Sequence, residues 1–163
     1  GILVDFNAVK GGIEIIPLDN DWQRAAHVYS DEVLISHRTD AEKGTPKFER
    51  GKSLSDRQRE MIYISGTAAI RGEESIVTGD VLVQTEITLE NIQHLIGLEE
   101  GREKLPEHSG KLELLRVYLK HEEDAEIVKE DMDKLCPDVP IVYLYADVCR
   151  EELLVEIEGI AYL

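Results

Sequence analysis

Two glutamates near the end of the chain are the first candidates for chemistry. Glu156 and Glu158 lie within an apolar run, residues 153–160. Because side chains alternate along a strand, the two carboxyl groups share one face, with Leu154 and Ile160 beside them. A carboxylate on the packed side of a sheet is costly unless it is paired or protonated, so it marks a candidate site. The alternative is that both acids face water on an edge strand, and the sequence leaves both interpretations open.

A run of small residues is the second candidate. The stretch 62–70 reads IYISGTAAI, which predicts a strand that enters a segment of small side chains. Small side chains let a ligand or another backbone approach closely. We therefore expect Gly66, Thr67 and Ala68 to bind substrate, and a tightly packed core strand is the alternative.

Length and charge limit the classes of function. The chain has 163 residues, which indicates one domain with a core of ordinary size. Acids outnumber bases 34 to 18, giving a net charge of −16, and the bases are dispersed. This field repels phosphate backbones, so we expect no nucleic-acid partner. An anionic substrate would need a local cationic pocket.

Targeting and cofactor signals are absent from the sequence. No apolar run approaches the roughly 18 residues that span a membrane, and no signal-peptide pattern opens the chain, so we expect a cytoplasmic protein. Cys136 and Cys149 are expected to be reduced thiols. No Cys or His pair has zinc-ligand spacing, and no P-loop or dinucleotide fingerprint occurs, so we expect no metal and no cofactor.

Residues 1–61 are predicted to form an extension that packs on the core. The β-rich runs 2–9 and 13–18 flank Lys10-Gly11-Gly12, which is typical of a hairpin. A weak strand is plausible at 32–36. The remainder of 19–61 is interpreted as a long loop, and loops of this length are usually functional or mobile.

Residues 62–163 are predicted to form the core in the order β-α-β-α-β-β. Asp80 is a good N-cap for a helix over about 81–98, with Gly101 soon after its end, and Pro137 stops a second helix. Strands are expected at 62–70, 112–119, 139–148 and 153–162, with a turn or short hairpin between Gly72 and Gly79. The pattern indicates an α+β fold in which one mixed sheet carries both helices on one face.

Helical spacing also predicts which side chains are buried. In the first helix the apolar stripe consists of Leu82, Leu89, Ile92 and Ile96, with Thr85 filling the gap, and the solvated positions are Gln84, Glu86, Glu90 and Asn91. In the second helix the stripe consists of Ala125, Val128, Met132 and Leu135.

Four motifs in the core resemble the RidA/YjgF (endoribonuclease L-PSP-like) superfamily. They are ISGTAAI at 64–70, GDVLVQTEITLENI at 79–92, LRVYL at 115–119 and VEIEGIA at 155–161. The resemblance implies the chorismate-mutase-like α+β fold and a homotrimer with small-molecule clefts between subunits. It implies that Glu156 is the functional glutamate. The deaminases of the superfamily carry an Arg two residues after the Pro of the penultimate strand, whereas Pro140 here is followed by Ile141 and Val142. Without that bidentate cation, imine or enamine deamination is disfavoured.

A second resemblance, over about 19–163, is to the carboxyl half of chorismatases, a two-unit branch of the superfamily that hydrolyses the enolpyruvyl ether of chorismate. It rests on 19–26, Tyr29, TPKFERG at 45–51, SGTAAIRG at 65–72 and ADVCREELLVEIEG at 146–159. Two departures are that one unit is present instead of two, and that Glu73 stands where a His often occurs.

The second resemblance implies a set of site residues. Glu156 would be a general acid with a raised pKa, and Cys149 would lie near the reacting group. Arg50 and Arg150 would bind substrate carboxylates, with Tyr29 as a hydrogen-bonding partner. We therefore expect a chorismatase-like hydrolase or lyase that acts on a small carboxylate metabolite. A regulatory trimer that binds such a metabolite without turnover, and a residual imine deaminase, remain alternatives.

Overall fold

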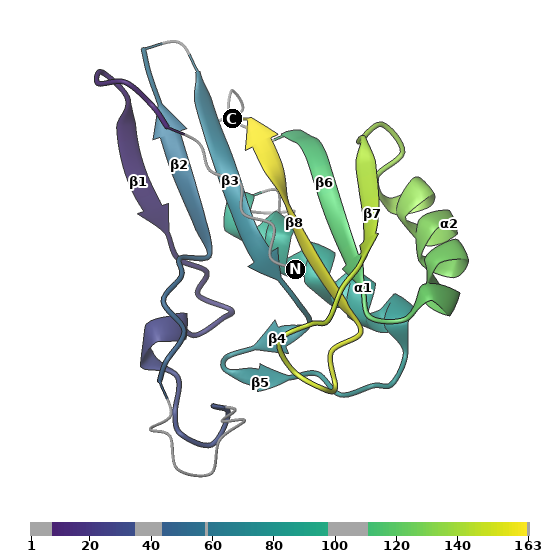
Figure 1. The fold of residues 1–163 in the computed structure, drawn as a ribbon. Coiled ribbons are helices and arrows are strands. Elements are labelled where there is room, and N and C mark those ends of the chain that lie inside the picture. Colours follow the sequence, from purple (N-terminus) through teal and green to yellow (C-terminus); the bar gives the residue numbers. More distant parts are fainter. Residues whose placement is uncertain (1–7, 35–43, 58, 98–110, 163) are drawn as a thin grey trace.

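A six-stranded mixed sheet carries two α-helices on one face (Figure 1), in the computed structural model, which describes residues 8–34, 44–57, 59–97 and 111–162. This confirms the α+β fold. The elements are β1 (Glu14–Leu18), β2 (Gly51–Ser55), β3 (Glu60–Thr67), β4 (Ile70–Arg71), β5 (Glu74–Ser75), α1 (Val81–Ile96), β6 (Lys111–Leu119), α2 (Ala125–Leu135), β7 (Ile141–Tyr145) and β8 (Val155–Tyr162), with single 3-10 turns at Ala26–Val28 and Glu122–Asp124.

The last strand of the chain occupies the middle of the sheet. The strand order is β1-β2-β3-β8-β6-β7, and every neighbouring pair is antiparallel except β6 and β7, which α2 connects as a parallel pair. The short strands β4 and β5 form a separate hairpin, in which Gly72 adopts a positive φ of 61° at the turn. Because β8 lies between β3 and β6, its side chains meet neighbours from both sides.

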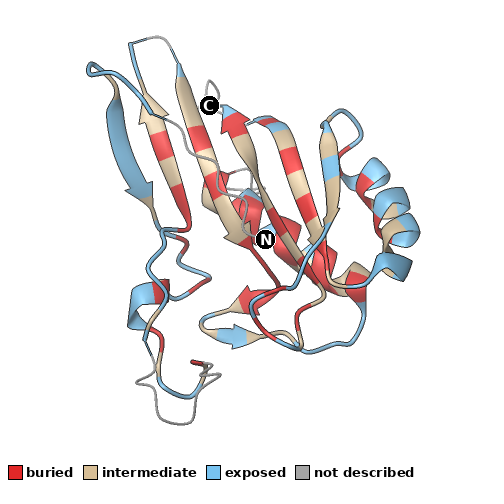
Figure 2. Cartoon of the chain, in the orientation of Figure 1, coloured by how far each residue is buried: buried red, intermediate tan, exposed pale blue. Residues whose placement is uncertain are grey.

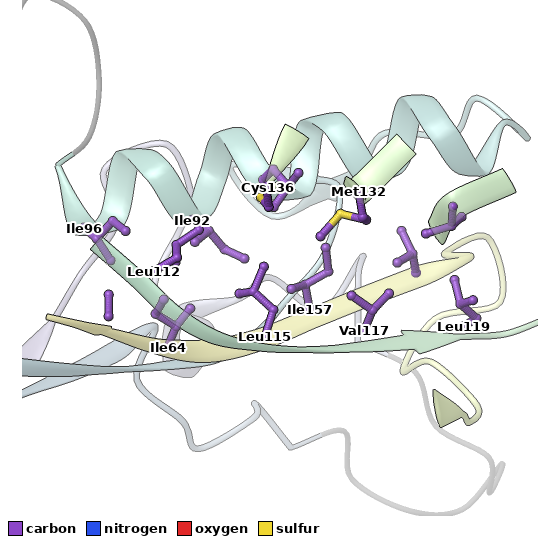
Figure 3. Close-up of a cluster of buried hydrophobic side chains, with 14 of the residues drawn as sticks. Ile64, Ile92, Ile96, Leu112, Leu115, Val117, Leu119, Met132, Cys136 and Ile157 are labelled. Carbon is purple, nitrogen blue, oxygen red and sulfur yellow. The ribbon is translucent and has the colours of Figure 1, made fainter. Parts of the chain in front are cut away.

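One apolar cluster between the sheet and the helices forms the main core (Figure 3). Ile92 of α1, Met132 of α2 and Ile157 of β8 all belong to this cluster. Both helices therefore cover the same face, and Figure 1 views the sheet from the other, helix-free face. The alternating burial of the central strands, visible as stripes in Figure 2, follows from this one-sided packing. None of the helices in the described ranges is long and apolar enough to cross a membrane.

The helix ends follow from local chemistry. Asp80 caps α1 as expected, because its carboxylate accepts hydrogen bonds from the amides of Leu82 (2.9 Å) and Val83 (3.4 Å). Gly97, at a φ of 72°, ends this helix, whereas Gly101 lies outside the described residues. At the end of α2 the prediction for Leu135 was wrong, since it is 43% exposed. The chain leaves the helix at Cys136, which is buried instead at 7% exposure.

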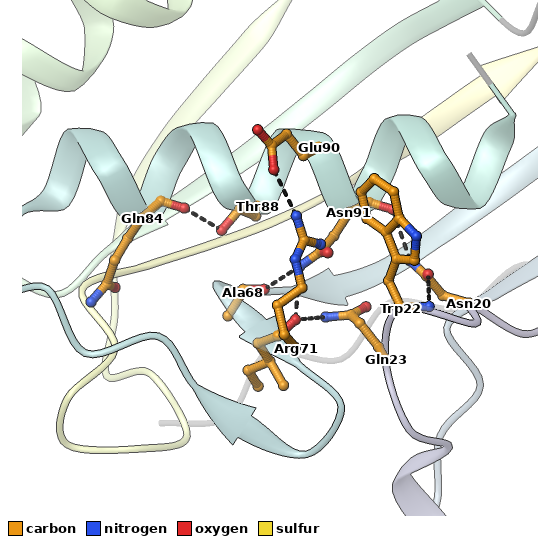
Figure 4. Close-up of polar contacts among 10 residues, drawn as sticks. Asn20, Trp22, Gln23, Ala68, Arg71, Gln84, Thr88, Glu90 and Asn91 are labelled. Atoms are coloured by element: carbon orange, nitrogen blue, oxygen red, sulfur yellow. Dashed lines mark hydrogen bonds and ion pairs between the residues drawn. The ribbon is translucent and has the colours of Figure 1, made fainter. Parts of the chain in front are cut away.

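The predicted solvation of Gln84 and Asn91 was also wrong, because α1 is covered on a second side (Figure 4). Both side chains are fully buried. Gln84 binds the 152–154 backbone, while the Asn91 amide donates to the carbonyls of Ala68 (3.0 Å) and Ile70 (3.1 Å). Asn20 in turn donates to the Asn91 carbonyl at 2.9 Å. These polar residues join α1 to the small-residue segment after β3 and to the amino-terminal segment.

Replacing Asn91 by Ala is expected to lower the free energy of unfolding by about 2–3 kcal/mol, because two buried carbonyls lose a donor and a cavity remains. Gln93→Ala is the matched control, since Gln93 is exposed on the same helix and should change stability by less than about 0.5 kcal/mol. Urea denaturation measures both. Equal, small effects would contradict a structural role for Asn91.

The amino-terminal third differs from the sequence-based expectation. Most of the predicted strand 2–9 lies outside the described residues, and the second strand of that hairpin, β1, pairs with β2 instead. The predicted strand at 32–36 was wrong over 32–34, which form no strand, and 35–36 are not described. The long loop expected over 19–61 contains β2 and the start of β3. Strand β2 extends the sheet because it pairs with β3 in full register.

Candidate active site

A cavity of about 500 Å³ lies beside β3 and β8, where they meet the loop between β7 and β8. Residues from four separate parts of one chain form its wall. They are Tyr29, Val33, Leu34, Gly44, Pro46, Phe48, Arg50, Ser65, Gly66, Ala68, Ile70, Cys149, Arg150 and Glu156. All predicted site residues except Thr67 are among them.

A β-bulge in β3 brings two consecutive small residues to the cavity. The β3–β8 register shifts between Ile64, which pairs with Gly159, and Thr67, which pairs with Ile157. Ser65 and Gly66 therefore both line the cavity. The bulge returns Thr67 to the core side, where it is 2% exposed and donates to the Ser65 carbonyl at 2.8 Å. The structure thus does not place Thr67 in contact with the cavity, contrary to the sequence-based prediction.

Glu156 presents its carboxyl group to the cavity from the helix-free face of β8. That group packs directly on Gly66, because a Cβ added there would lie only 2.2 Å from Glu156 Oε1. Burial, and secondarily the charge of Glu158, raise the pKa of Glu156. The carboxyl forms no hydrogen bond or ion pair within the described part of the chain. Glu156 therefore retains its proton to a higher pH than an ordinary glutamic acid.

Arg50 is a buried cation in the wall of the same cavity. It is 3% exposed, and its Nη2 donates to the carbonyl of Arg24 (2.8 Å) and to the hydroxyl of Tyr29. Its guanidinium lies over the Phe48 ring, 5.1 Å from the centroid. The buried Nε finds no hydrogen-bond partner among the described residues. A buried donor without a partner indicates room for an acceptor from a ligand.

Arg150 supplies a second buried cation, at 7% exposure. Its Nη1 donates to the Glu73 carbonyl (2.8 Å) and to Ser75 Oγ (2.9 Å), and its guanidinium carbon lies 5.4 Å from the Tyr29 ring. Tyr29 thus contacts both guanidinium groups. Neither Arg50 nor Arg150 forms an ion pair with an acid of the described ranges, so the cavity is locally positive within an acidic protein.

Glu73 anchors the segment that carries Tyr29. Its carboxylate accepts from the Ser30 amide (2.8 Å) and from Arg24 Nη1 (3.0 Å). Hydrogen bonding from Ser30, followed by the charge of Arg24, lowers the pKa of Glu73, so the anchor stays ionised at neutral pH. This residue positions a wall of the cavity and does not itself line it.

Cys149 lies close to Glu156 at the cavity wall. The residue as a whole is exposed, yet burial of its thiol, and then the nearby Glu156 charge, raise the thiol pKa. A protonated thiol is a poor nucleophile. The predicted proximity of Cys149 to a reacting group stays a prediction, and the raised thiol pKa disfavours covalent catalysis.

Sequence reasoning missed the apolar half of the cavity, namely Val33, Leu34, Pro46, Phe48 and Ile70. The TPKFERG motif contained the signal for two of them, since Pro46 and Phe48 flank a lysine just before Arg50. Val142, at the position where deaminases of the superfamily carry an Arg, is 47% exposed and does not line the cavity.

Comparison with known proteins finds relatives of this chain among the chorismatases. No family model matches the chain. It is 36% identical over 136 residues to a chorismatase of Streptomyces rapamycinicus, covering 78% of this chain and 41% of that protein. It is 37% identical over 123 residues to a 3-hydroxybenzoate synthase of Streptomyces hygroscopicus, covering 71% and 36%. The chain therefore spans less than half the length of these relatives.

Comparison with solved structures identifies the fold. A chorismatase crystal structure superposes with a TM-score of 0.73 at 28% identity, over 90% of this chain and 43% of that one. The YjgF gene product of E. coli shares the fold alone, with a TM-score of 0.53 at 20% identity over 71% of this chain and 87% of its own. The fold is therefore that of the RidA/YjgF superfamily. Within it, the chain is a homologue of the chorismatases.

Proposed function

We propose that this chain carries a chorismatase-like active site, which cleaves the enolpyruvyl ether of chorismate or of a closely related small carboxylate. The observation that supports this most is that one cavity combines a proton-retaining Glu156 with the buried guanidinium groups of Arg50 and Arg150, neither of which forms an ion pair with a described acid. Homology to a chorismatase and to a 3-hydroxybenzoate synthase favours the same chemistry.

The two arginines suit a substrate with more than one carboxylate. Guanidinium groups bind carboxylates through charge-assisted, often bidentate hydrogen bonds. Binding of an anion would offset the cost of keeping Arg50 and Arg150 buried without an ionic partner. The apolar side chains of Phe48, Val33 and Leu34 would contact a carbocyclic ring between the charged groups.

Glu156 would start the reaction as general acid. Its carboxyl proton moves to the terminal methylene carbon of the enolpyruvyl group, and the ether oxygen stabilises the resulting oxocarbenium ion. Water then adds at the cationic carbon and returns a proton to the Glu156 carboxylate. Collapse of the hemiketal releases pyruvate and the ring alcohol, so one water is consumed and the acid is regenerated. A buried carboxyl group with a raised pKa is suited to this proton transfer near neutral pH.

Replacing Arg50 by Met tests substrate binding. We expect the KM for chorismate to rise about 10- to 100-fold, as one charge-assisted carboxylate contact is lost, while kcat falls less. Lys52→Met is the matched control: it also removes one positive charge from this segment, but Lys52 pairs with Glu49 at 2.8 Å and does not line the cavity. Pyruvate release, coupled to lactate dehydrogenase and NADH, measures both. Equal effects of the two substitutions would contradict a specific role for Arg50.

Three measurements decide between the proposed function and its alternatives. Pyruvate release from chorismate supports the hydrolase. A chorismate-induced rise in Tm without pyruvate release would support a binding module. Ammonia release from 2-aminoacrylate would support the deaminase. A homotrimer remains our expectation for the assembly, and sedimentation velocity measures it.

A further inference from the structure

Three side chains on the helix-free face form a hydrogen-bonded group beside the proposed acid. Arg116 Nη1 and the Tyr118 hydroxyl both donate to the same atom, Glu158 Oε1, each at 2.7 Å. In the β6–β8 pairing, Tyr118 stands directly opposite Glu156, and Arg116 directly opposite Glu158. None of these three residues lines the cavity. The mechanism described above therefore gives them no role.

Glu158 lies close enough to Glu156 for the charge of its carboxylate to act on the Glu156 carboxyl group. Glu156 and Glu158 are two residues apart on one strand, so their side chains point to the same face with Cα atoms about 7 Å apart. Two donors on one oxygen hold the Glu158 carboxylate in one place. Glu158 is partly buried, with a side-chain exposure of 28%, so its field is only partly screened by solvent.

We propose that the Glu158 carboxylate, held by Arg116 and Tyr118, keeps the proton on Glu156, and that these three side chains are positioning residues for the proposed reaction. The inference rests on the proposed function insofar as the proton is used in catalysis. Its physical content, an electrostatic coupling between Glu158 and Glu156, is independent of any substrate. The direction of the Glu156 pKa agrees with this coupling.

Other groups facing Glu156 act in addition to this one. Gly66, from β3, brings no charge. The loop between β7 and β8 contributes Arg150, which favours the ionised acid, and the Cys149 thiol. Arg50 lines the same cavity and also favours ionisation. Both cations oppose protonation of Glu156, and among the described residues Glu158 is the charged neighbour that raises its pKa.

The test uses charge changes of opposite sign. In Glu158→Gln the Glu156 carboxyl should titrate at lower pH than in the parent, because a nearby negative charge is removed. In Arg116→Gln it should titrate at higher pH, because the Glu158 charge loses its counterion. Arg116→Lys should restore the parent midpoint of the Glu156 titration. Tyr118→Phe, which changes no charge, should shift this midpoint least. The readout is the carboxyl ¹³C shift in protein labelled at glutamate, assigned as the signal that is absent in Glu156→Gln.

Shifts of opposite sign support the inference, because a merely structural role would move both variants in the same way. No shift, or two shifts of the same sign, overturns it. If Glu158→Gln does not fold, Arg116→Gln with its Lys rescue decides alone.

Turnover of chorismate is measured separately on the same variants. Glu158→Gln should lose about threefold to tenfold in kcat at the alkaline end of the pH profile, with KM unchanged. If the midpoints move and chorismate is not turned over by any variant, the coupling stands and the proposed function fails.

Discussion

Replacing Glu156 by Gln is expected to reduce the kcat for chorismate by about 10²- to 10⁴-fold, with KM changed less than about threefold. The amide has nearly the same shape but no acidic proton, and general acid catalysis contributes about this factor. Binding by Arg50 and Arg150 is unaffected because neither contacts the Glu156 carboxyl in a hydrogen bond. Initial rates of pyruvate release between pH 5 and pH 9 measure the effect. An unchanged kcat would remove the assigned role.

The same substitution is expected to stabilise the protein at neutral pH. The folded-state pKa of Glu156 lies above its ordinary value of 4.5, through burial and through Glu158. As pH rises above that ordinary value, the unfolded chain releases this proton first, so stability falls until pH passes the raised folded-state pKa. Gln avoids this loss. Glu156→Gln should therefore raise Tm at pH 8 and leave it nearly unchanged at pH 4.

Glu86→Gln is the control for this measurement, since it makes the same change of charge at an exposed site of α1. It should alter Tm little at either pH. A gain for Glu156→Gln that is equal at pH 4 and pH 8 would mean that its origin is packing and not protonation.

Replacing Gly66 by Ala is expected to reduce the kcat for chorismate about 100-fold while costing little stability. The new Cβ would lie 2.2 Å from Glu156 Oε1 and 2.9 Å from its Cδ. Because these atoms belong to the end of a flexible side chain, the carboxyl can rotate away, and the free energy of unfolding should fall by about 1 kcal/mol or less. The rotated acid no longer reaches the substrate, and a misplacement of about 1 Å can cost 10²-fold in rate.

Gly159→Ala is a matched substitution that should lower the stability of the protein more than Gly66→Ala does. Its Cβ would meet the Leu114 carbonyl oxygen at 2.5 Å and Leu115 Cδ2 at 2.7 Å, and the backbone atom cannot rotate away. We expect a loss of about 1–3 kcal/mol in stability. Gly44→Ala, at a cavity glycine with no atom within 4 Å of the added Cβ, should change neither quantity.

A double-mutant cycle isolates the contact between Gly66 and Glu156. If the clash is with the Glu156 side chain, Gly66→Ala should cost nothing in stability once Glu156 is Ala. The same cost in both backgrounds would show that the backbone of the bulge, and not the acid, resists the added methyl group. Chemical denaturation of the four proteins provides the measurement.

Local patterns in the sequence were sufficient to predict the helices and strands of the core. Asp80 at a helix start, the apolar spacing of α1 and α2 and the alternation in 155–161 each depend on neighbours within a few residues, so they could be read directly. The same-face arrangement of Glu156 and Glu158 follows from that alternation. The choice of Arg50, Cys149 and Arg150 came instead from resemblance to chorismatases, and the cavity brings these residues together with Glu156.

The predictions that were wrong concern residues whose partners lie far away in the sequence. Asn91 and Gln84 carry polar side chains at positions that helical spacing assigns to solvent, and only the carbonyls of segments far along the chain reveal why they are buried. Strand β2 has no strong alternation, and it exists because β1 and β3 pair with its two edges. Thr67 was misassigned because a bulge, which adds one residue to a strand, reverses the face of everything after it.

Residue types and their spacing were enough to predict the α+β elements, the acidic character of the chain and the two glutamates on one face of the last strand. The folded chain was needed to show that Glu156 lies in a cavity with two guanidinium groups that form no ion pair with a described acid. It also showed that Glu158 lies outside this cavity, hydrogen-bonded to Arg116 and Tyr118. How far a side chain is buried, and which charges surround it, depends on contacts with segments that are far away in the sequence. A periodic pattern fixes the direction of a side chain, and the neighbouring strands and loops fix what it meets there.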